Sequence, residues 1–276
     1  LADGLLFVGV SVLVAALGVL IGLLASAASG AKKEGYRRQT VALSAFGNSG
    51  YMPITVTEIF AGTLPGFASV FGREEPALLI GAYLIAFSPL LWSVGNYIMT
   101  GKGSKLRLRT FVSPPFIGIV AGILVPLLGL QEAFADPRLP FATVVDVAER
   151  LGGVTSALVM IVVGSMIAEL GHPRHVRRPI KVMAAVVSVA RFFVLPGLFW
   201  LIYALFLRHI DLAPPVLWVL FLQTHVPPAT NLAIMARDKD VGRDEAAYVL
   251  FVTYLIYLAL LPLFMMLYLG VTGIRF

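Results

Sequence analysis

The sequence predicts an all-α integral membrane protein that crosses the bilayer about eight times. Hydrophobic residues make up 59% of the 276-residue chain and charged residues only 13%, and the mean hydropathy is +0.90. A soluble domain of this size is about 25% charged, because water must solvate its whole surface. The chain has no cysteine, which excludes disulfides, thiolate metal sites and cysteine nucleophiles.

Long apolar runs divide the chain into membrane spans. A helix needs about 20 apolar residues to cross the hydrocarbon core of a bilayer. The predicted spans are residues 4–28, 40–61, 77–99, 111–130, 147–169, 180–206, 215–236 and 246–269.

The positive charges alternate between the links that join these spans. The links 29–39, 101–109, 170–181 and 236–245 hold fifteen of the twenty-one Lys and Arg residues, whereas the other links hold one each. The positive-inside rule therefore places the rich links in the cytoplasm and both chain ends outside. The net charge of +6 follows from this topology, and no nucleic-acid partner is needed to explain it.

Two of the spans contain helix breakers and polar side chains at mid-membrane depth. Proline removes a backbone donor, and glycine lowers the cost of unwinding a helix. In lipid, the freed backbone groups must be satisfied by protein or by water in a cavity, so each span is expected to split into two half-helices. The alternative for each span is a simple proline kink. The candidate binding residues are Asn48, Ser49, Gly50 and Pro53 in the second span, and Gln223, Thr224, His225, Pro227, Pro228 and Asn231 in the seventh.

The two interrupted spans have matching positions in the chain. When Pro53 is aligned with Pro228, Asn48 falls on Gln223, and the two spans cross the membrane in opposite senses. Interrupted spans in corresponding positions indicate a transporter site built from inverted repeats. Because half-helix N-termini carry partial positive charge, two such ends at the midplane would form an anion site.

Two ionisable residues lie close to this predicted site. Arg191 is near the bilayer centre in the sixth span, where arginine usually faces a cavity or a partner. We expect it either to contact a substrate anion or to form a structural pair. His225 lies beside the second break; it could couple transport to protons or serve as a neutral hydrogen-bonding group.

At these residues the chain resembles the auxin efflux carrier family, which includes the plant PIN-FORMED and PIN-LIKES proteins. The resemblance rests on Gly47-Asn48-Ser49-Gly50 with Pro53, on the run Pro227 to Asn231, and on the shorter segments 113–118 and 161–165. The spacing from Asn48 to Pro53 is closer to the PIN-LIKES pattern. The resemblance implies ten spans in two inverted five-helix repeats, each with a proline-broken fourth helix.

Mapped onto that pattern, the chain has three parts. Residues 1–100 correspond to family helices 3–5 with the crossover at 47–53, residues 101–110 form a cytoplasmic linker, and residues 111–276 form the second repeat with the crossover at 223–231. Two further spans are then expected ahead of Leu1.

The resemblance and the two breaks together predict a secondary transporter in the cell membrane of a prokaryote. Its substrate is expected to be a small carboxylate-bearing anion, either auxin-like or a dicarboxylate, moved by elevator-type alternating access. The predicted partners are this anion, the lipid bilayer and a second copy of the chain; no cofactor or metal is predicted. The alternatives are a sodium- or proton-coupled symporter or exchanger of the bile-acid-transporter-like fold and, less favoured, an intramembrane enzyme. Neither residues 44–57 nor residues 221–234 contain Asp or Glu, which argues against a cation–proton exchanger.

Overall fold

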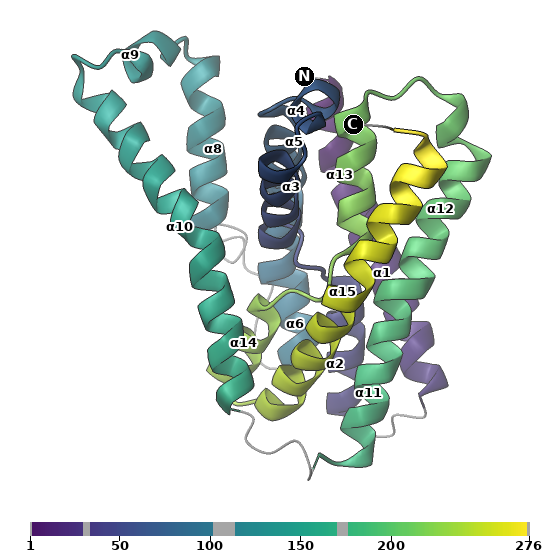
Figure 1. Ribbon diagram of the computed structural model, residues 1–276. Coiled ribbons are helices and arrows are strands. Elements are labelled where there is room, and N and C mark those ends of the chain that lie inside the picture. The colour runs from purple at the N-terminus through teal and green to yellow at the C-terminus, as the bar shows by residue number, and fades with distance from the viewer. Residues whose placement is uncertain (1, 30–33, 102–113, 170–175, 275–276) are drawn as a thin grey trace.

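In this computed structural model the described residues, 2–29, 34–101, 114–169 and 176–274, form helices joined by short links (Figure 1). The first half contains α1 (Ala2–Ala28), α2 (Glu34–Ala45), α3 (Tyr51–Thr63), α4 (Phe67–Phe71), α5 (Glu75–Leu90), η1 (Leu91–Gly95) and α6 (Asn96–Thr100). The second half contains α8 (Pro114–Leu127), α9 (Gln131–Ala135), α10 (Pro140–Glu169), α11 (Arg178–Val189), η3 (Ala190–Val194), α12 (Leu195–Leu205), η4 (Leu207–His209), α13 (Pro214–His225), α14 (Asn231–Asp238) and α15 (Arg243–Thr272).

The helices confirm the predicted all-α membrane fold. Among the described residues, four continuous helical runs are long and apolar enough to cross a bilayer: Gly4–Ala28, Glu75–Thr100, Arg178–His209 and Arg243–Thr272. The predicted second and seventh spans are each divided into two shorter helices, α2 with α3 and α13 with α14. The predicted fourth and fifth spans correspond to α8 and α10, although residues 111–113 lie outside the described residues.

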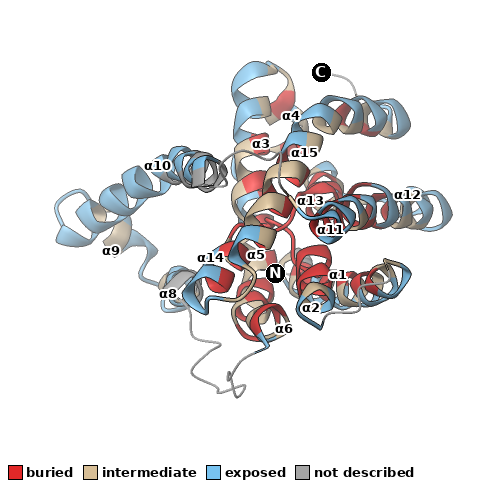
Figure 2. Cartoon of the chain, turned by 90° about the horizontal axis from the view of Figure 1, so that it is seen from below, coloured by how far each residue is buried: buried red, intermediate tan, exposed pale blue. Residues whose placement is uncertain are grey.

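The helices form two groups. The core bundle comprises α1 to α6 and α11 to α15, and the outer pair comprises α8 and α10, which α9 joins at one end (Figure 1). Buried residues concentrate inside the core bundle, whereas the outer pair is largely exposed along its length (Figure 2). The outer pair meets the core bundle where α8 contacts α5 and where α10 contacts α3 and α15. A bilayer would cover the apolar exposed surfaces of both groups.

The closest packing in the core bundle is between α1 and α2. Gly18 and Gly22 lie one turn apart on α1, and a Cβ built on either would approach the backbone of Ala45 or Val41 within 2.7–2.9 Å. Small residues at this spacing let two membrane helices approach backbone to backbone. This packing fixes the position of α2, which leads into the first break.

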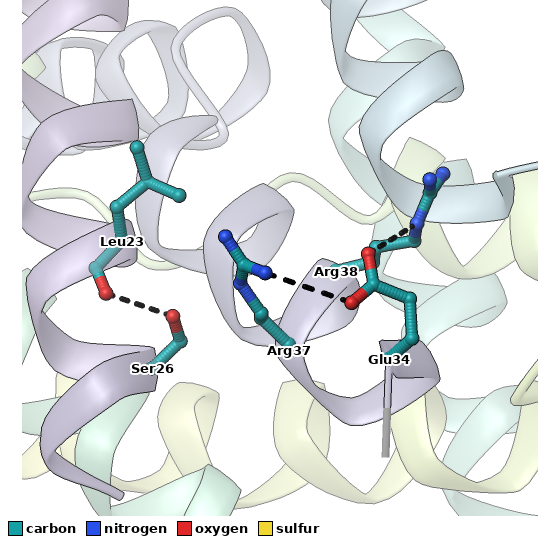
Figure 3. A network of polar contacts seen from close by, with 5 residues as sticks. All are labelled: Leu23, Ser26, Glu34, Arg37 and Arg38. Carbon is teal, nitrogen blue, oxygen red and sulfur yellow. Dashed lines mark hydrogen bonds and ion pairs between the residues drawn. The ribbon is translucent and has the colours of Figure 1, made fainter. Parts of the chain in front are cut away.

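Charged side chains gather at one end of the core bundle. Glu34 begins α2, accepts a hydrogen bond from Nε of Arg38 at 3.0 Å and forms an ion pair with Arg37 at 3.7 Å (Figure 3). An acidic residue in the first turn also interacts favourably with the positive end of the helix. The start of α1 and the end of α15 lie at the opposite end of the molecule (Figure 1), as an even number of crossings requires.

Candidate functional site

The two breaks pair with each other at the centre of the core bundle. Residues 46–50 separate α2 from α3, and residues 226–230 separate α13 from α14. We call these two segments the crossing. Gly47 and Pro228 form an antiparallel bridge, with hydrogen bonds from the Asn48 N–H to the Pro227 carbonyl (2.7 Å) and from the Ala229 N–H to the Phe46 carbonyl (2.9 Å). The crossing therefore satisfies backbone groups that an unwound segment would otherwise leave unpaired in lipid.

The prolines of the two breaks do not occupy matching positions. Pro227 and Pro228 lie within the second break, whereas Pro53 is the third residue of α3. The breaks have equal lengths, so the helix bounds align Tyr51 with Asn231, and the predicted alignment of Pro53 with Pro228 is wrong by five residues. The first turn of a helix tolerates proline because its N–H groups have no partner within the helix.

A cavity of about 280 Å³ opens beside the crossing. The half-helices α3 and α14 both begin at its wall, where Tyr51 and Asn231 are their first residues. The preceding residues, Gly50 and Thr230, form no capping hydrogen bond through a side chain. Both helix N-termini therefore place partial positive charge at the cavity wall, although in α14 the N–H groups of Leu232 and Ala233 already donate to the carbonyls of Ala229 and Thr230. The cavity lining consists of Gly47, Asn48, Ser49, Gly50, Tyr51, Ile54, Glu58, Leu84, Phe87, Ser88, Leu91, Trp92, Gly152, Ala229 and Asn231.

Asn48 links the crossing to the last helix. Its side-chain Nδ2 donates to the hydroxyl of Tyr254 on α15 at 2.6 Å, and that hydroxyl in turn donates to the Pro228 carbonyl at 3.4 Å. Asn48 is only 4% exposed yet lines the cavity. Its amide is thus held in place by a partner that also contacts the second break.

Gln223 and Thr224 lie on α13 directly before the second break. Gln223 donates from Nε2 to the Ser49 carbonyl at 3.0 Å, and among the described residues its Oε1 has no hydrogen-bond partner. The hydroxyl of Thr224 donates to carbonyls of its own helix, at Leu220 (3.1 Å) and Phe221 (2.9 Å). Gln223 therefore stabilises the first break through its hydrogen bond to Ser49, and the Thr224 hydroxyl hydrogen-bonds within the last turn of α13.

His225 points into a cluster of aromatic rings on the other side of α13. Its Nδ1 lies 2.7 Å from the Phe221 carbonyl, and its ring centroid is 4.2 Å from that of Phe221, 4.8 Å from Phe264 and 5.6 Å from Phe199. The imidazole is not among the groups that line the cavity.

Arg191, in the π-helical segment η3, packs against the crossing. It is 1% exposed; its Nε donates to the Val226 carbonyl at 3.0 Å and its Nη1 to the Ser44 carbonyl at 3.5 Å. A Cβ added to Gly47 would collide with this guanidinium group. A side chain at residue 47 would therefore displace the guanidinium group, and Arg191 contacts the far side of the cavity wall instead of the cavity itself.

The site thus contains some predicted residues and several that the sequence did not indicate. Asn48, Ser49, Gly50 and Asn231 line the cavity, whereas Pro53 is buried in the first turn of α3. The additional lining residues lie within the breaks (Gly47 and Ala229) or on α3, α5, η1 and α10, and on these helices only Glu58 carries a charge that the sequence could have indicated. Among the described residues, no group of three His, Asp or Glu side chains could hold a metal ion.

Comparisons with known proteins agree with this architecture. A family model described as membrane transport protein matches residues 1–265. The chain is 26% identical over 152 residues to Protein PIN-LIKES 7 and to Protein PIN-LIKES 5, both from Arabidopsis thaliana. Each alignment covers 54% of this chain and 38% of the relative, so the chain spans well under half the length of these curated relatives. No solved structure matches the chain. The chain therefore belongs to the membrane transport protein family of the auxin efflux carrier type, a family of multi-pass membrane transporters.

Proposed function

We propose that the protein moves a small organic anion across the membrane by alternating access, with the cavity beside the crossing as its binding site. The observation that carries this proposal is the start of both α3 and α14 at the cavity wall, without side-chain caps. Two helix N-termini at the wall of one cavity favour a carboxylate, because their partial positive charge and their unpaired N–H groups attract its oxygens. The amides of Asn48 and Asn231 add donors that fix its orientation.

The rest of the lining supports a substrate with an apolar body and a single carboxylate. The apolar part of the lining consists mainly of Ile54, Leu84, Phe87, Leu91 and Trp92. A flat aromatic or aliphatic group would pack against these side chains and lose contact with water.

A second carboxylate on the substrate would be unfavourable in this cavity. Glu58 lies on α3, seven residues beyond Tyr51, and contributes to the same lining. Its negative charge would repel the second charge of a dicarboxylate. The lining thus favours an auxin-like monocarboxylate over a dicarboxylate.

The two groups of helices support an elevator-type movement. The cavity lies between the crossing and α10, which contributes Gly152 to its wall. The outer pair contacts the core bundle through few elements, so the core bundle can slide against it and carry the site from one side of the membrane to the other.

A sodium-coupled symporter is a second candidate, and one observation favours it. Gln223 Oε1 is a buried acceptor without a partner among the described residues, and it lies beside the backbone of the crossing. Buried acceptors are normally satisfied, and oxygen atoms are the ligands that a sodium ion would use. Uptake into proteoliposomes with sodium replaced by choline tests this candidate: unchanged uptake would reject sodium coupling.

Binding of aromatic monocarboxylates to the purified protein tests the proposed site. Asn48→Ala and Asn231→Ala should each weaken binding about ten- to a hundred-fold, because a lost hydrogen bond to a charged group costs about 1.5–3 kcal/mol. The control is Asn96→Ala, which changes an asparagine outside the cavity lining. Calorimetry gives the affinity, and a melting curve for each variant shows that it remains folded. Wild-type affinity in both cavity variants would rule out this cavity as the binding site.

A further inference from the structure

Arg191 is a buried positive charge with no negative partner in the part of the chain that the structure describes. It is 1% exposed and forms no ion pair with any described Asp or Glu; its hydrogen bonds go to the backbone carbonyls of Val226 and Ser44. Burying a charge costs much free energy unless it is paired. Intramembrane charges are usually functional for this reason.

The carbonyls that Arg191 contacts belong to the C-terminal ends of two half-helices. Ser44 lies in the last turn of α2, and Val226 is the C-cap of α13. Each helix C-terminus carries a partial charge of about −0.5, and each N-terminus carries about +0.5. All four half-helix ends meet at the crossing, so without a further charge their partial charges would sum to about zero.

The positive charge of the Arg191 guanidinium offsets the negative partial charges of the two helix C-termini. Its charge of +1 offsets the combined charge of about −1 at the ends of α2 and α13. The N-termini of α3 and α14, which begin at the cavity wall, then give the crossing a net positive charge. Gly47 makes this arrangement possible, because it lines the cavity on one side and leaves room for the guanidinium on the other.

We propose that Arg191 is the positioning residue that makes the crossing selective for anions, acting through the two helix C-termini without touching the solute. This inference rests on the proposed function of the cavity. Two unit charges on the order of 8 Å apart, at an effective dielectric constant of about 20, attract with a free energy equivalent to about 30-fold in affinity. Arg191 should therefore favour a carboxylate over its neutral isostere by about that factor.

The test compares a carboxylate with its carboxamide, using indole-3-acetate and indole-3-acetamide as probes in calorimetry on the purified full chain. Arg191→Gln should lower the affinity for the carboxylate about 30-fold and change the affinity for the amide less than about threefold. Arg191→Lys keeps the charge and should keep most of the preference for the carboxylate. The matched control is Arg208→Gln, an exposed arginine at the far end of the same helical run.

Each outcome decides between the alternatives. If Arg191→Gln lowers the affinity for the carboxylate and for the carboxamide equally, Arg191 only stabilises the structure of the crossing. That result would overturn the inference. If Arg191→Gln fails to fold, Arg191→Lys provides the test. This variant keeps the positive charge, so a folded Arg191→Lys protein that no longer prefers the carboxylate would also overturn the inference. A wild-type protein without any preference for the carboxylate would contradict the proposed function itself. A preference in the wild type that Arg191→Gln leaves intact would contradict only the role of Arg191.

Discussion

Individual residues at the crossing have two kinds of task. Gly47 and Asn48 face the cavity, whereas Gln223 and Tyr254 hold the two breaks in register through hydrogen bonds to Ser49, Asn48 and Pro228. The second group is as important to the site as the first, because a break in lipid persists only if other groups satisfy its backbone and side chains. A substitution of a bracing residue should therefore affect stability first and binding second.

Tyr254→Phe removes one hydroxyl and tests whether Tyr254 stabilises the crossing. Removing the hydroxyl leaves the buried Nδ2 of Asn48 without its acceptor, and an unsatisfied buried donor costs about 1–3 kcal/mol. We expect a lower melting temperature in detergent and a smaller loss of substrate affinity than Asn48→Ala gives. Tyr248→Phe is the control, because Tyr248 is on the same helix and forms no hydrogen bond to the described residues of the crossing. Equal melting temperatures for both variants would show that Tyr254 does not brace the crossing.

Among whole elements, α1 sets the position of the first broken helix. Its two glycines bring it against the backbone of α2, and it also packs along α5. In the interior of a membrane protein, packing of this kind replaces the hydrophobic effect as the main source of association between helices. The continuous helix α1 thus positions the first break.

Alanine substitutions on α1 test this packing directly. In Gly18→Ala and Gly22→Ala the new Cβ would meet backbone atoms of α2 at 2.7–2.9 Å, which must force the helices apart. Overpacking of this kind costs about 1–3 kcal/mol, so both variants should melt at lower temperature. Gly9→Ala is a matched control on the same helix, because nothing lies within 4 Å of its new Cβ. If all three variants melt alike, α1 and α2 are not in this close contact.

At the scale of the whole molecule, the site lies between the core bundle and the outer pair. The cavity wall comes from the crossing, α3, α5 and η1 in the core bundle and from Gly152 on α10 in the outer pair. A solute bound there contacts both groups of helices. Movement of one group against the other would therefore change which side of the membrane the cavity opens to.

Cross-linking across the cavity tests this movement. The chain contains no cysteine, so Gly152→Cys with Ile54→Cys gives a unique pair in the cavity lining, with one cysteine on each group of helices, and a Cβ at residue 152 meets nothing within 4 Å. A short bifunctional maleimide should stop transport in proteoliposomes, while the single-cysteine variants treated with the same reagent keep most of it. Full transport by the cross-linked pair would exclude a sliding movement between the two groups.

The sequence by itself determined the membrane fold, the approximate spans and the existence of two breaks. These follow from local properties, because apolar length decides what crosses a bilayer, and proline and glycine decide where a helix unwinds. It also indicated Asn48, Ser49, Gly50 and Asn231, which lie within or directly beside the breaks and line the cavity.

Only the tertiary structure decided which side chains face the cavity. The side chain of His225 packs in an aromatic cluster on the other side of α13. Arg191 hydrogen-bonds to the ends of two helices that are far from it in the sequence. The direction of such a side chain depends on the rotation of its helix and on its neighbours, and neither is encoded in the local residues. The same holds for Tyr254 and Gly152, which reach the site only because α15 and α10 pack beside it.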